Sequence, residues 1–387
     1  MLKKPFLMIP GPTNVPERVL QAMHRPLINH RGPEYEVMFQ RISLDIRKIF
    51  QTKQPVLIYP AAGTGMMEAA IVNILSPGDK VLALSIGVFG NRLAEIAEKF
   101  GAKVEKLEFA WGHQADPALV AQKLAEDKNH EIKAVLMTHN ETSTGVTNDI
   151  QALAAACSGH PALRVVDAVS SLGAVELKMD EWHLDVVFTG AQKALMLPPG
   201  LGFLALSEKA WQAQAASTMP KYYWDAALLK KSLVKWQNPY TPPVTLLFGL
   251  AESLTMIEEE GLSAVFHRHQ LIGEAVRAAM EALGLGLFAD KAGASDTVTS
   301  VLVPEGFDVK KIQQHMRDVY GIVLAGGQKQ LENKIFRIGH LGYITPSDVL
   351  LTISALELTL AALGKEGLQG KGVKAAQDVF LAELSKQ

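Results

Sequence analysis

The chain of 387 residues contains a single cysteine, Cys157. One thiol excludes a disulfide within the chain and is typical of a protein from a reducing compartment. Cys157 lies in the alanine-rich stretch 153–158, which has the composition of a helix. We therefore interpret it as a core residue rather than as a nucleophile.

Long apolar runs are also missing. None approaches the roughly 20 residues that a membrane-spanning helix needs, and Pro5 and Pro10 interrupt the N-terminal apolar patch well short of a signal peptide. The net charge is only −2 at pH 7, which gives no basic surface for nucleic acid. The sequence predicts a cytoplasmic protein that acts on neither membranes nor nucleic acids.

Patterns typical of metal sites are scarce. The 11 histidines show no His-Glu-x-x-His or related spacing. His267 and His269 fall on one predicted helix without ligands facing them. We therefore expect no metal centre.

What the chain does have is a regular alternation of short apolar runs with amphipathic stretches from about residue 55. This alternation predicts an α/β fold, with a mostly parallel seven-stranded sheet between layers of helices. At 48% apolar and 20% charged residues, the chain can bury a large core. The predicted strands are 56–59, 80–85, 103–108, 133–138, 164–168, 185–189 and 202–206.

The alternation ends after Trp211. Residues 212–242 are aromatic and look irregular, and a long helical pattern, broken at Gly261, follows from 244 to about 283. Strands at 298–303, 322–324 and 334–338 and helices at 309–319, 346–363 and 373–384 complete a smaller α+β unit. We expect an N-terminal segment (1–22), a large domain (23–255) and a small C-terminal domain (256–387).

A lysine and an aspartate follow two of the predicted strands. Lys193 comes after the buried run 186–188, which Thr189 and Gly190 end, and Asp167 closes the strand 164–168. The carboxyl ends of parallel strands share one edge, where open sheets bind their ligands. This pair suits pyridoxal 5′-phosphate, since a lysine can form its Schiff base and an aspartate can hold its ring nitrogen protonated. Alone, each residue is as typical of a surface position or a turn.

Other polar motifs follow strands as well. Gly63 and Thr64 lie in a turn that enters a helix and could bind a phosphate, although this turn is not a Walker A loop. Phe89 could stack on a cofactor ring or simply pack. His139 could act as a general base, but nothing in the spacing supplies it with a partner. Arg337 could bind a substrate carboxylate or form a structural salt bridge.

Taken together, these motifs resemble the class V, fold-type I aminotransferases that use pyridoxal phosphate, in particular the alanine–glyoxylate and serine–glyoxylate group. They occur in the family's order and span nearly the whole chain. They are residues 10–13 (PGPT), 63–68 (GTGMME), 139–145 (HNETSTG), 166–173 (VDAVSSLG), 190–194 (GAQKA), 198–200 (PPG) and 337–342 (RIGHLG).

The resemblance implies a role for each residue at the ring. Lys193 would carry the cofactor and Asp167 would pair with its ring nitrogen. Val169 and Phe89 would lie on the two faces of the ring, and Thr142 would contact its hydroxyl. Phe89 stands where some members have a tryptophan, which keeps the stacking but loses an indole N–H.

The resemblance also implies residues for the phosphate and the substrate. Gly63, Thr64 and Gln192 would hold the phosphate, and Thr241 would reach the partner's phosphate across a homodimer interface. Asn238 stands where some relatives have a phosphate-binding tyrosine, and the neighbouring Tyr240 could take that part instead. Arg337 would bind the substrate carboxylate.

The expected activity is a ping-pong transamination between a small amino acid, alanine or serine, and a small 2-oxo acid, glyoxylate or pyruvate. Ureidoglycine and aminoethylphosphonate are alternative donors, because motifs do not encode the shape of the pocket. A cysteine desulfurase-like lyase is a weaker alternative, because Cys157 precedes the lysine instead of lying in a C-terminal loop. A non-catalytic subunit with the same fold is a third possibility.

Overall fold

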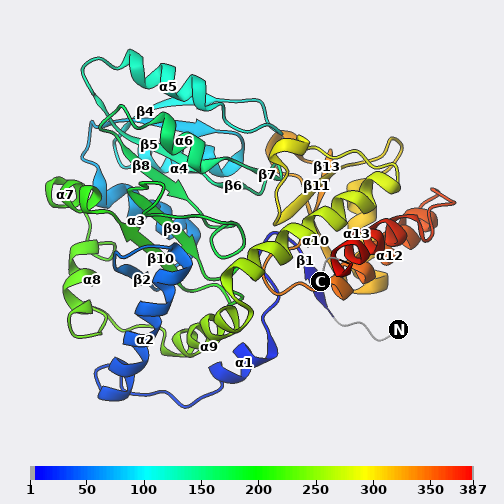
Figure 1. Cartoon of the computed structure of the whole chain (residues 1–387), viewed down its shortest axis with the longest axis horizontal. Helices are drawn as coiled ribbons and strands as arrows, with labels where there is room; N and C mark the ends of the chain where they lie inside the picture. The colour runs from blue at the N-terminus through cyan, green and yellow to red at the C-terminus, as the bar shows by residue number, and fades with distance from the viewer. Residues whose placement is uncertain (1–4, 386–387) are drawn as a thin grey trace.

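The computed structural model describes residues 5–385, and its largest element is a sheet of seven strands in the order β2-β10-β9-β8-β5-β3-β4 (Figure 1). Strand β10 runs antiparallel to both of its neighbours, and the other neighbouring pairs are parallel. The predicted α/β architecture with a mostly parallel sheet is confirmed. The strands are β2 (Val56–Tyr59), β3 (Lys80–Ser85), β4 (Lys103–Glu108), β5 (Ile132–Thr138), β8 (Leu163–Asp167), β9 (Val186–Gly190) and β10 (Gly202–Leu206).

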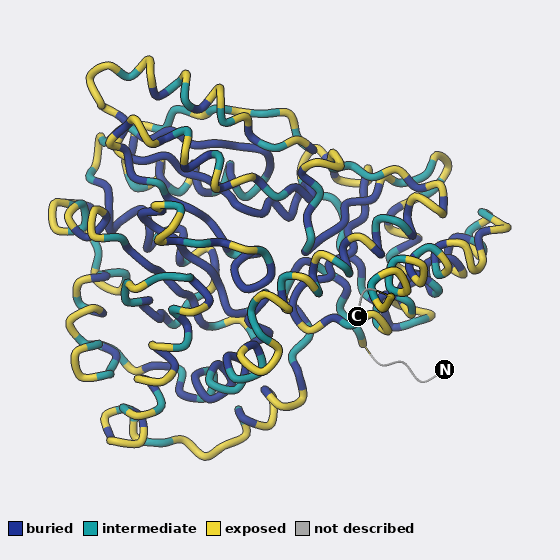
Figure 2. The backbone as a smooth tube through the Cα atoms, in the orientation of Figure 1, coloured by how far each residue is buried: buried dark blue, intermediate teal, exposed yellow. Residues whose placement is uncertain are grey.

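The central strands are apolar because both faces of the sheet are covered. Successive residues point to opposite faces, so Val165 and Val186 join one apolar cluster while Val166 and Val187 join the other. Figure 2 shows these strands as buried backbone between helices whose outer sides are exposed. Burial on both faces explains why these strands read as continuous apolar runs instead of alternating patterns.

Two sets of helices cover the two faces. The first set packs into the cluster around Val166 and comprises α2 (Pro33–Phe50), α5 (Pro117–Glu126), α6 (Ile150–Ala156) and α9 (Val244–Glu260), with α1 (Glu17–Met23) against α9. The second set packs into the cluster around Val165 and comprises α3 (Gly63–Ile74), α4 (Val88–Lys99), α7 (Glu208–Ala216) and α8 (Ala226–Leu233). Cys157 ends α6 inside the first cluster, and burial raises the pKa of its thiol to about 11.

One prediction about secondary structure was wrong. Residues 212–242 are not irregular throughout, because α7 extends to Ala216 and α8 occupies Ala226–Leu233. The Asp225 carboxylate accepts hydrogen bonds from the backbone N–H groups of Ala227 and Leu228 and so caps α8. The many aromatic residues on either side of this short helix obscured its helical periodicity in the sequence.

A second sheet has the order β1-β12-β13-β11. Its first strand comes from the N-terminal segment and runs parallel to β12, although more than 300 residues separate the two along the chain. The strands are β1 (Phe6–Met8), β11 (Val298–Leu302), β12 (Ile322–Gly326) and β13 (Ile335–Gly339). The helices packed on this sheet are α10 (Leu262–Ala282), α11 (Val309–His315), α12 (Pro346–Ala362) and α13 (Lys371–Leu384). The domain bounds 1–22, 23–255 and 256–387 stay a proposal.

Short elements fill the remaining connections. A two-stranded hairpin pairs β6 (Asn140–Glu141) with β7 (Val146–Thr147). The short helices are η1 (Lys291–Gly293), η2 (Met316–Tyr320) and η3 (Lys329–Leu331). Within residues 5–385, the structure has no helix of the length and apolarity that crossing a membrane requires.

Two buried histidines fix the region where the small sheet meets the large one. His269 donates from Nδ1 to the Val265 carbonyl and accepts at Nε2 from the Gly342 N–H. Gly342 has a φ of +81°, and a Cβ there would lie 3.0 Å from the Lys193 carbonyl oxygen. His340 donates to the Asp296 carbonyl and accepts from a threonine hydroxyl. Burial lowers the pKa of each imidazole to about 3, so both are neutral in the folded protein.

Replacing one of these histidines should flatten the pH dependence of stability. A pKa lowered from 6.5 to about 3 means that the stabilisation is complete above pH 6.5 and is lost as the pH falls toward 3. Between pH 6 and pH 4, urea unfolding should show that the wild type loses about 1.4 kcal/mol more per pH unit than His269→Gln. His24→Gln, which replaces an exposed histidine at the end of α1, is the control. Equal slopes for the wild type and His269→Gln would contradict this account.

Candidate active site

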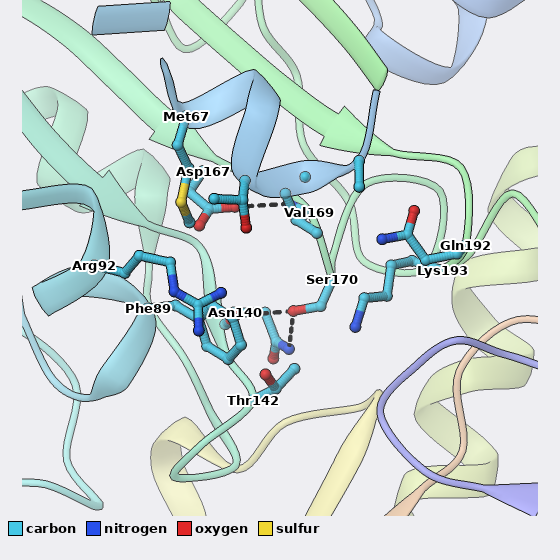
Figure 3. Close-up of a pocket in the computed structure, with 13 residues that line it drawn as sticks. Met67, Phe89, Arg92, Asn140, Thr142, Asp167, Val169, Ser170, Gln192 and Lys193 are labelled. Atoms are coloured by element: carbon cyan, nitrogen blue, oxygen red, sulfur yellow. Dashed lines mark hydrogen bonds between the residues drawn. The ribbon is translucent and has the colours of Figure 1, made fainter. Parts of the chain in front are cut away.

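A single cavity lies at the carboxyl-end edge of the large sheet (Figure 3). It brings together eight of the residues singled out in the sequence, which come from loops and helix starts that are far apart in the chain. These are Gly63, Thr64, Phe89, Thr142, Asp167, Val169, Gln192 and Lys193. The other lining residues are Ala62, Met67, Arg92, Asn140 and Ser170.

Lys193 points into this cavity from the turn after β9. Its Nζ donates to the Pro10 carbonyl at 2.6 Å, and its own carbonyl accepts from the Thr13 hydroxyl at 3.0 Å. Burial and the positive charge of Arg337 lower the pKa of the amine to about 8. At pH 7 about a tenth of this lysine is therefore uncharged and nucleophilic, far more than for an ordinary lysine with a pKa of about 10.4.

Asp167 ends β8 on the opposite side of the cavity and is 3% exposed. Its Oδ1 accepts from the Val169 N–H at 2.9 Å. Burial raises the pKa of this carboxyl to about 7, and the negative charge of Glu141 acts in the same direction. A positive group placed against Asp167 would stabilise its ionised form, and a protonated pyridine nitrogen is such a group.

The start of helix α3 fits a phosphate group. The first hydrogen bond of the helix runs from Met66 N to Ala62 O, and no side chain caps the N–H groups that precede it. A Cβ at Gly63 would lie 2.9 Å from both Val169 methyl groups. Any residue larger than glycine would therefore clash with Val169 at this position. Beside this turn, the buried Oε1 of Gln192 has no hydrogen-bond partner within residues 5–385. Free N–H groups at a helix start are suited to an anion, and Gln192 would contribute its Nε2 donor, because its Oε1 can only accept.

Phe89 and Arg92 lie one turn apart at the beginning of α4. The Arg92 guanidinium carbon is 4.7 Å from the centre of the Phe89 ring, and both side chains line the cavity. The sequence analysis missed Arg92, although its position three residues after Phe89 would have indicated the same helix face. It also missed Asn140, whose Nδ2 donates to the hydroxyls of Ser170 and Thr297.

Arg337 lies in β13, behind the part of the cavity that Thr142 lines. Its Nε donates to the Gly326 carbonyl and its Nη1 to the Thr142 carbonyl, each at 2.8 Å. Burial lowers the pKa of the guanidinium to about 10, which leaves it charged at neutral pH. Within residues 5–385, Nη2 has no hydrogen-bond partner, so the edge formed by Nη1 and Nη2 is the one available to a carboxylate.

Asn238 and Thr241 lie outside this cavity. Asn238 is buried, and its Oδ1 accepts a hydrogen bond from the Tyr35 hydroxyl. The Tyr240 hydroxyl donates to the Tyr222 carbonyl at 2.9 Å. Thr241 is exposed on the surface of the chain. Within one chain, therefore, these residues are not placed at the start of α3.

His139 is fully buried but does not line the cavity. Burial lowers the pKa of its imidazole to about 4, so the ring is neutral. Among residues 5–385, no group of three or more histidine, cysteine, aspartate or glutamate side chains is arranged to hold a metal ion.

The family model for aminotransferase class-V matches residues 6–349. The soluble hydrogenase 42 kDa subunit of Anabaena cylindrica is 46% identical over 97% of this chain and 99% of its own length. The serine–glyoxylate aminotransferase of Methylorubrum extorquens is 42% identical over 96% of this chain and 94% of its own. The crystal structure of ureidoglycine–glyoxylate aminotransferase from Bacillus subtilis has a TM-score of 0.93 and 32% identity, and covers 98% of this chain and 99% of that one.

The charges around Lys193 should set the pH at which its amine reacts. Acetylation by acetic anhydride, followed at Lys193 by peptide mass spectrometry, should be half-maximal near pH 8. Arg337→Gln removes a positive charge that lowers this pKa, so the midpoint should move to higher pH. Arg92→Gln should move it in the same direction by less, because the effect of Arg92 is weaker. A downward shift in Arg337→Gln would contradict the electrostatic account.

Proposed function

The chain belongs to the class V aminotransferases, and on that premise we propose that it transfers the amino group of a small amino acid, alanine or serine, to glyoxylate or pyruvate. It is a fold-type I enzyme that uses pyridoxal 5′-phosphate. The observation that carries the proposal is one cavity that contains a partly buried lysine, a buried aspartate and the uncapped start of a helix.

The cavity residues would hold the cofactor at three points. Lys193 would bind its aldehyde carbon and Asp167 its ring nitrogen, while Gly63, Thr64 and Gln192 would hold its phosphate. Phe89 and Val169 would enclose the ring, and Thr142 would contact the ring hydroxyl. When bound, pyridoxal phosphate supplies an electron-withdrawing ring that weakens the Cα–H bond of an attached amino acid.

The side chains around the cofactor would carry out the proton transfer. In its neutral form, Lys193 Nζ would take the proton from the substrate Cα and deliver it to the former aldehyde carbon of the cofactor. Asp167, ionised opposite a cation, keeps the proton on the ring nitrogen. Arg337 binds the substrate carboxylate through its Nη1 and Nη2 edge and so orients the Cα–H bond toward Lys193.

The choice of donor rests on the relatives and on Arg337. The serine–glyoxylate enzymes, at 39–42% identity, support serine, and a single carboxylate-binding arginine suits a small α-amino acid. Relatives described as L-aspartate–glyoxylate and ureidoglycine–glyoxylate enzymes make these donors the ones to compare. A cysteine desulfurase reaction is not supported, because Cys157 is buried in the core.

A second candidate function is a subunit without catalytic activity. It is favoured by the names of two relatives, at 45–46% identity, that are described as soluble hydrogenase subunits. A hydrogenase subunit that carried an iron–sulfur cluster would need several cysteine thiolates to hold it, and this chain has one cysteine. The aminotransferase residues Lys193 and Asp167, by contrast, are both present in the cavity. We therefore favour the enzyme.

Absorbance of the purified protein tests this choice directly. The wild type with pyridoxal phosphate should show a visible band that bleaches with L-alanine or L-serine and returns with glyoxylate. Lys193→Ala should lose at least about 100-fold in turnover, because it removes the group that moves the proton. Asp167→Asn should keep the band and lose turnover. The enzyme proposal would be wrong if Lys193→Ala had full turnover, and a protein that stays colourless with added cofactor would favour the subunit.

We also propose that the protein is a cytoplasmic homodimer in which Thr241 binds the phosphate held by the partner subunit. Thr241 is exposed, as a residue that reaches into another chain must be. The large apolar side chains of Leu27 and Val37 are 73% and 70% exposed and line one surface groove with Phe248. A surface of this kind is typical of a protein interface.

Mixed dimers should reveal whether Thr241 acts across the interface. Thr241→Asp places a negative charge against the phosphate and should abolish activity, whereas Thr241→Ser should retain it. Refolding Thr241→Asp together with Lys193→Ala should restore activity, because the mixed dimer has one site with both native residues. If Thr241 acted within its own chain, no site in the mixture would be complete and activity would stay absent.

A further inference from the structure

Glu141, a residue to which the sequence analysis gave no role, has an unusual position for a carboxylate. It is 0% exposed in the hairpin strand β6. Its Oε2 accepts from the backbone N–H groups of Phe89 and Gly90, at 2.8 and 3.1 Å. Its Oε1 accepts from the Ser143 N–H at 3.1 Å and the Ser143 hydroxyl at 2.6 Å. Four hydrogen bonds therefore compensate for the burial of this carboxylate, whose pKa burial raises.

These bonds replace the cap that helix α4 lacks. The N-cap residue is Gly87, which has no side chain to accept from the first turn. The Ser143 hydroxyl accepts from the Val88 N–H at 3.0 Å, and Glu141 accepts from the next two N–H groups. The first turn of a helix needs such acceptors and is stabilised by negative charge. Here they come from a loop more than 50 residues further along the chain.

The space at Gly87 shows how closely the carboxylate and the helix fit together. A Cβ at Gly87 would lie 2.5 Å from the Glu141 Cγ and 2.6 Å from its Cδ. The backbone there is extended, with a φ of 171°, so any residue could adopt the conformation. Glycine at this position is therefore required by the presence of Glu141 and not by the backbone angle.

The loop that carries Glu141 also contacts the rest of the site. The next residue, Thr142, lines the cavity with its side chain and accepts from Arg337 Nη1 with its carbonyl oxygen. The preceding residue, Asn140, lines the cavity and bonds Ser170 and Thr297. This short loop thus positions the Phe89 ring, through its hydrogen bonds to α4, and also the Arg337 guanidinium, through the Thr142 carbonyl.

From these contacts we propose that Glu141 is a positioning residue that anchors the first turn of α4, and with it the Phe89 ring, to the loop that carries Thr142. The inference rests on the proposed function, because it assigns Phe89 to the face of the cofactor ring. Glu141 does not line the cavity. Its charge raises the pKa of Asp167, and the positioning proposed here is separate from that effect, because it acts through the hydrogen bonds to the first turn of α4.

The first test uses the cofactor-loaded wild type, Glu141→Gln, Phe89→Leu and the double variant. Glu141→Gln should weaken pyridoxal phosphate binding about tenfold, since charge-assisted hydrogen bonds are roughly twice as strong as neutral ones. It should also change the visible circular dichroism of the bound cofactor as Phe89→Leu does. In the Phe89→Leu background, Glu141→Gln should have little further effect. Glu98→Gln, an exposed carboxylate on the same helix, is the control.

Gly87→Ala provides an independent route to the same displacement. It keeps the charge of Glu141 but pushes a methyl group into its Cγ, so it should reproduce the change in the dichroism. This variant decides the matter if Glu141→Gln fails to fold. The proposal is overturned by wild-type binding and dichroism in both variants, or by effects of Glu141→Gln and Phe89→Leu that simply add.

Hydrogen exchange separates this proposal from the proposed function. In the cofactor-free protein, the amides of Phe89 and Gly90 should exchange at least about tenfold faster in Glu141→Gln than in the wild type, because the acceptor that protects them is weakened. Unchanged exchange would overturn the anchoring of α4. A wild type that binds no pyridoxal phosphate but shows the exchange difference would overturn the proposed function and leave the anchoring in place.

Discussion

The rest of the site depends on the burial of two opposite charges at one edge of the parallel sheet. Asp167 and Lys193 follow neighbouring strands, β8 and β9, whose apolar residues exclude water from both faces. Burial raises the pKa of the carboxyl to about 7 and lowers that of the amine to about 8. Each group thus titrates near neutral pH. A ligand with a positive nitrogen would stabilise the ionised Asp167, and one with an aldehyde would react with the neutral Lys193.

The loop between β5 and β8 connects this edge to the small sheet. Thr142 accepts from Arg337 in β13, and Asn140 bonds Thr297 just before β11. The N-terminal segment adds a third connection. Its strand β1 pairs with β12 in the small sheet, and the Pro10 carbonyl, two residues beyond β1, accepts a hydrogen bond from Lys193 Nζ. The residues that line the cavity all lie between positions 62 and 193, and the small sheet and the N-terminal segment hold three of them, Thr142, Asn140 and Lys193, through hydrogen bonds. Residues more than 300 positions apart, such as Pro10 and Arg337, thus both contact residues that line the cavity.

The sequence was sufficient to predict the seven strands of the large sheet and eight of the 13 residues that line the cavity. Apolar periodicity is a local property, and parallel strands bring their carboxyl ends together whatever the details of packing. It was insufficient for α8, where aromatic residues obscured a short helix, and for Glu141, whose partners are more than 50 residues away. It also could not show that Asn238 bonds Tyr35 within its own chain.

The hydrogen bonds of Arg337 show why the donor is harder to predict than the reaction. Main-chain carbonyls occupy its Nε and one Nη1 hydrogen, so a carboxylate can approach only the Nη1 and Nη2 edge. In the role proposed for Arg337, this arrangement would orient the carboxylate, which any α-amino acid has, without reaching the side chain. Selection among alanine, serine and aspartate would therefore come from the residues that line the cavity. Arg92 is the lining residue with a guanidinium group, whose positive charge would attract an acidic side chain.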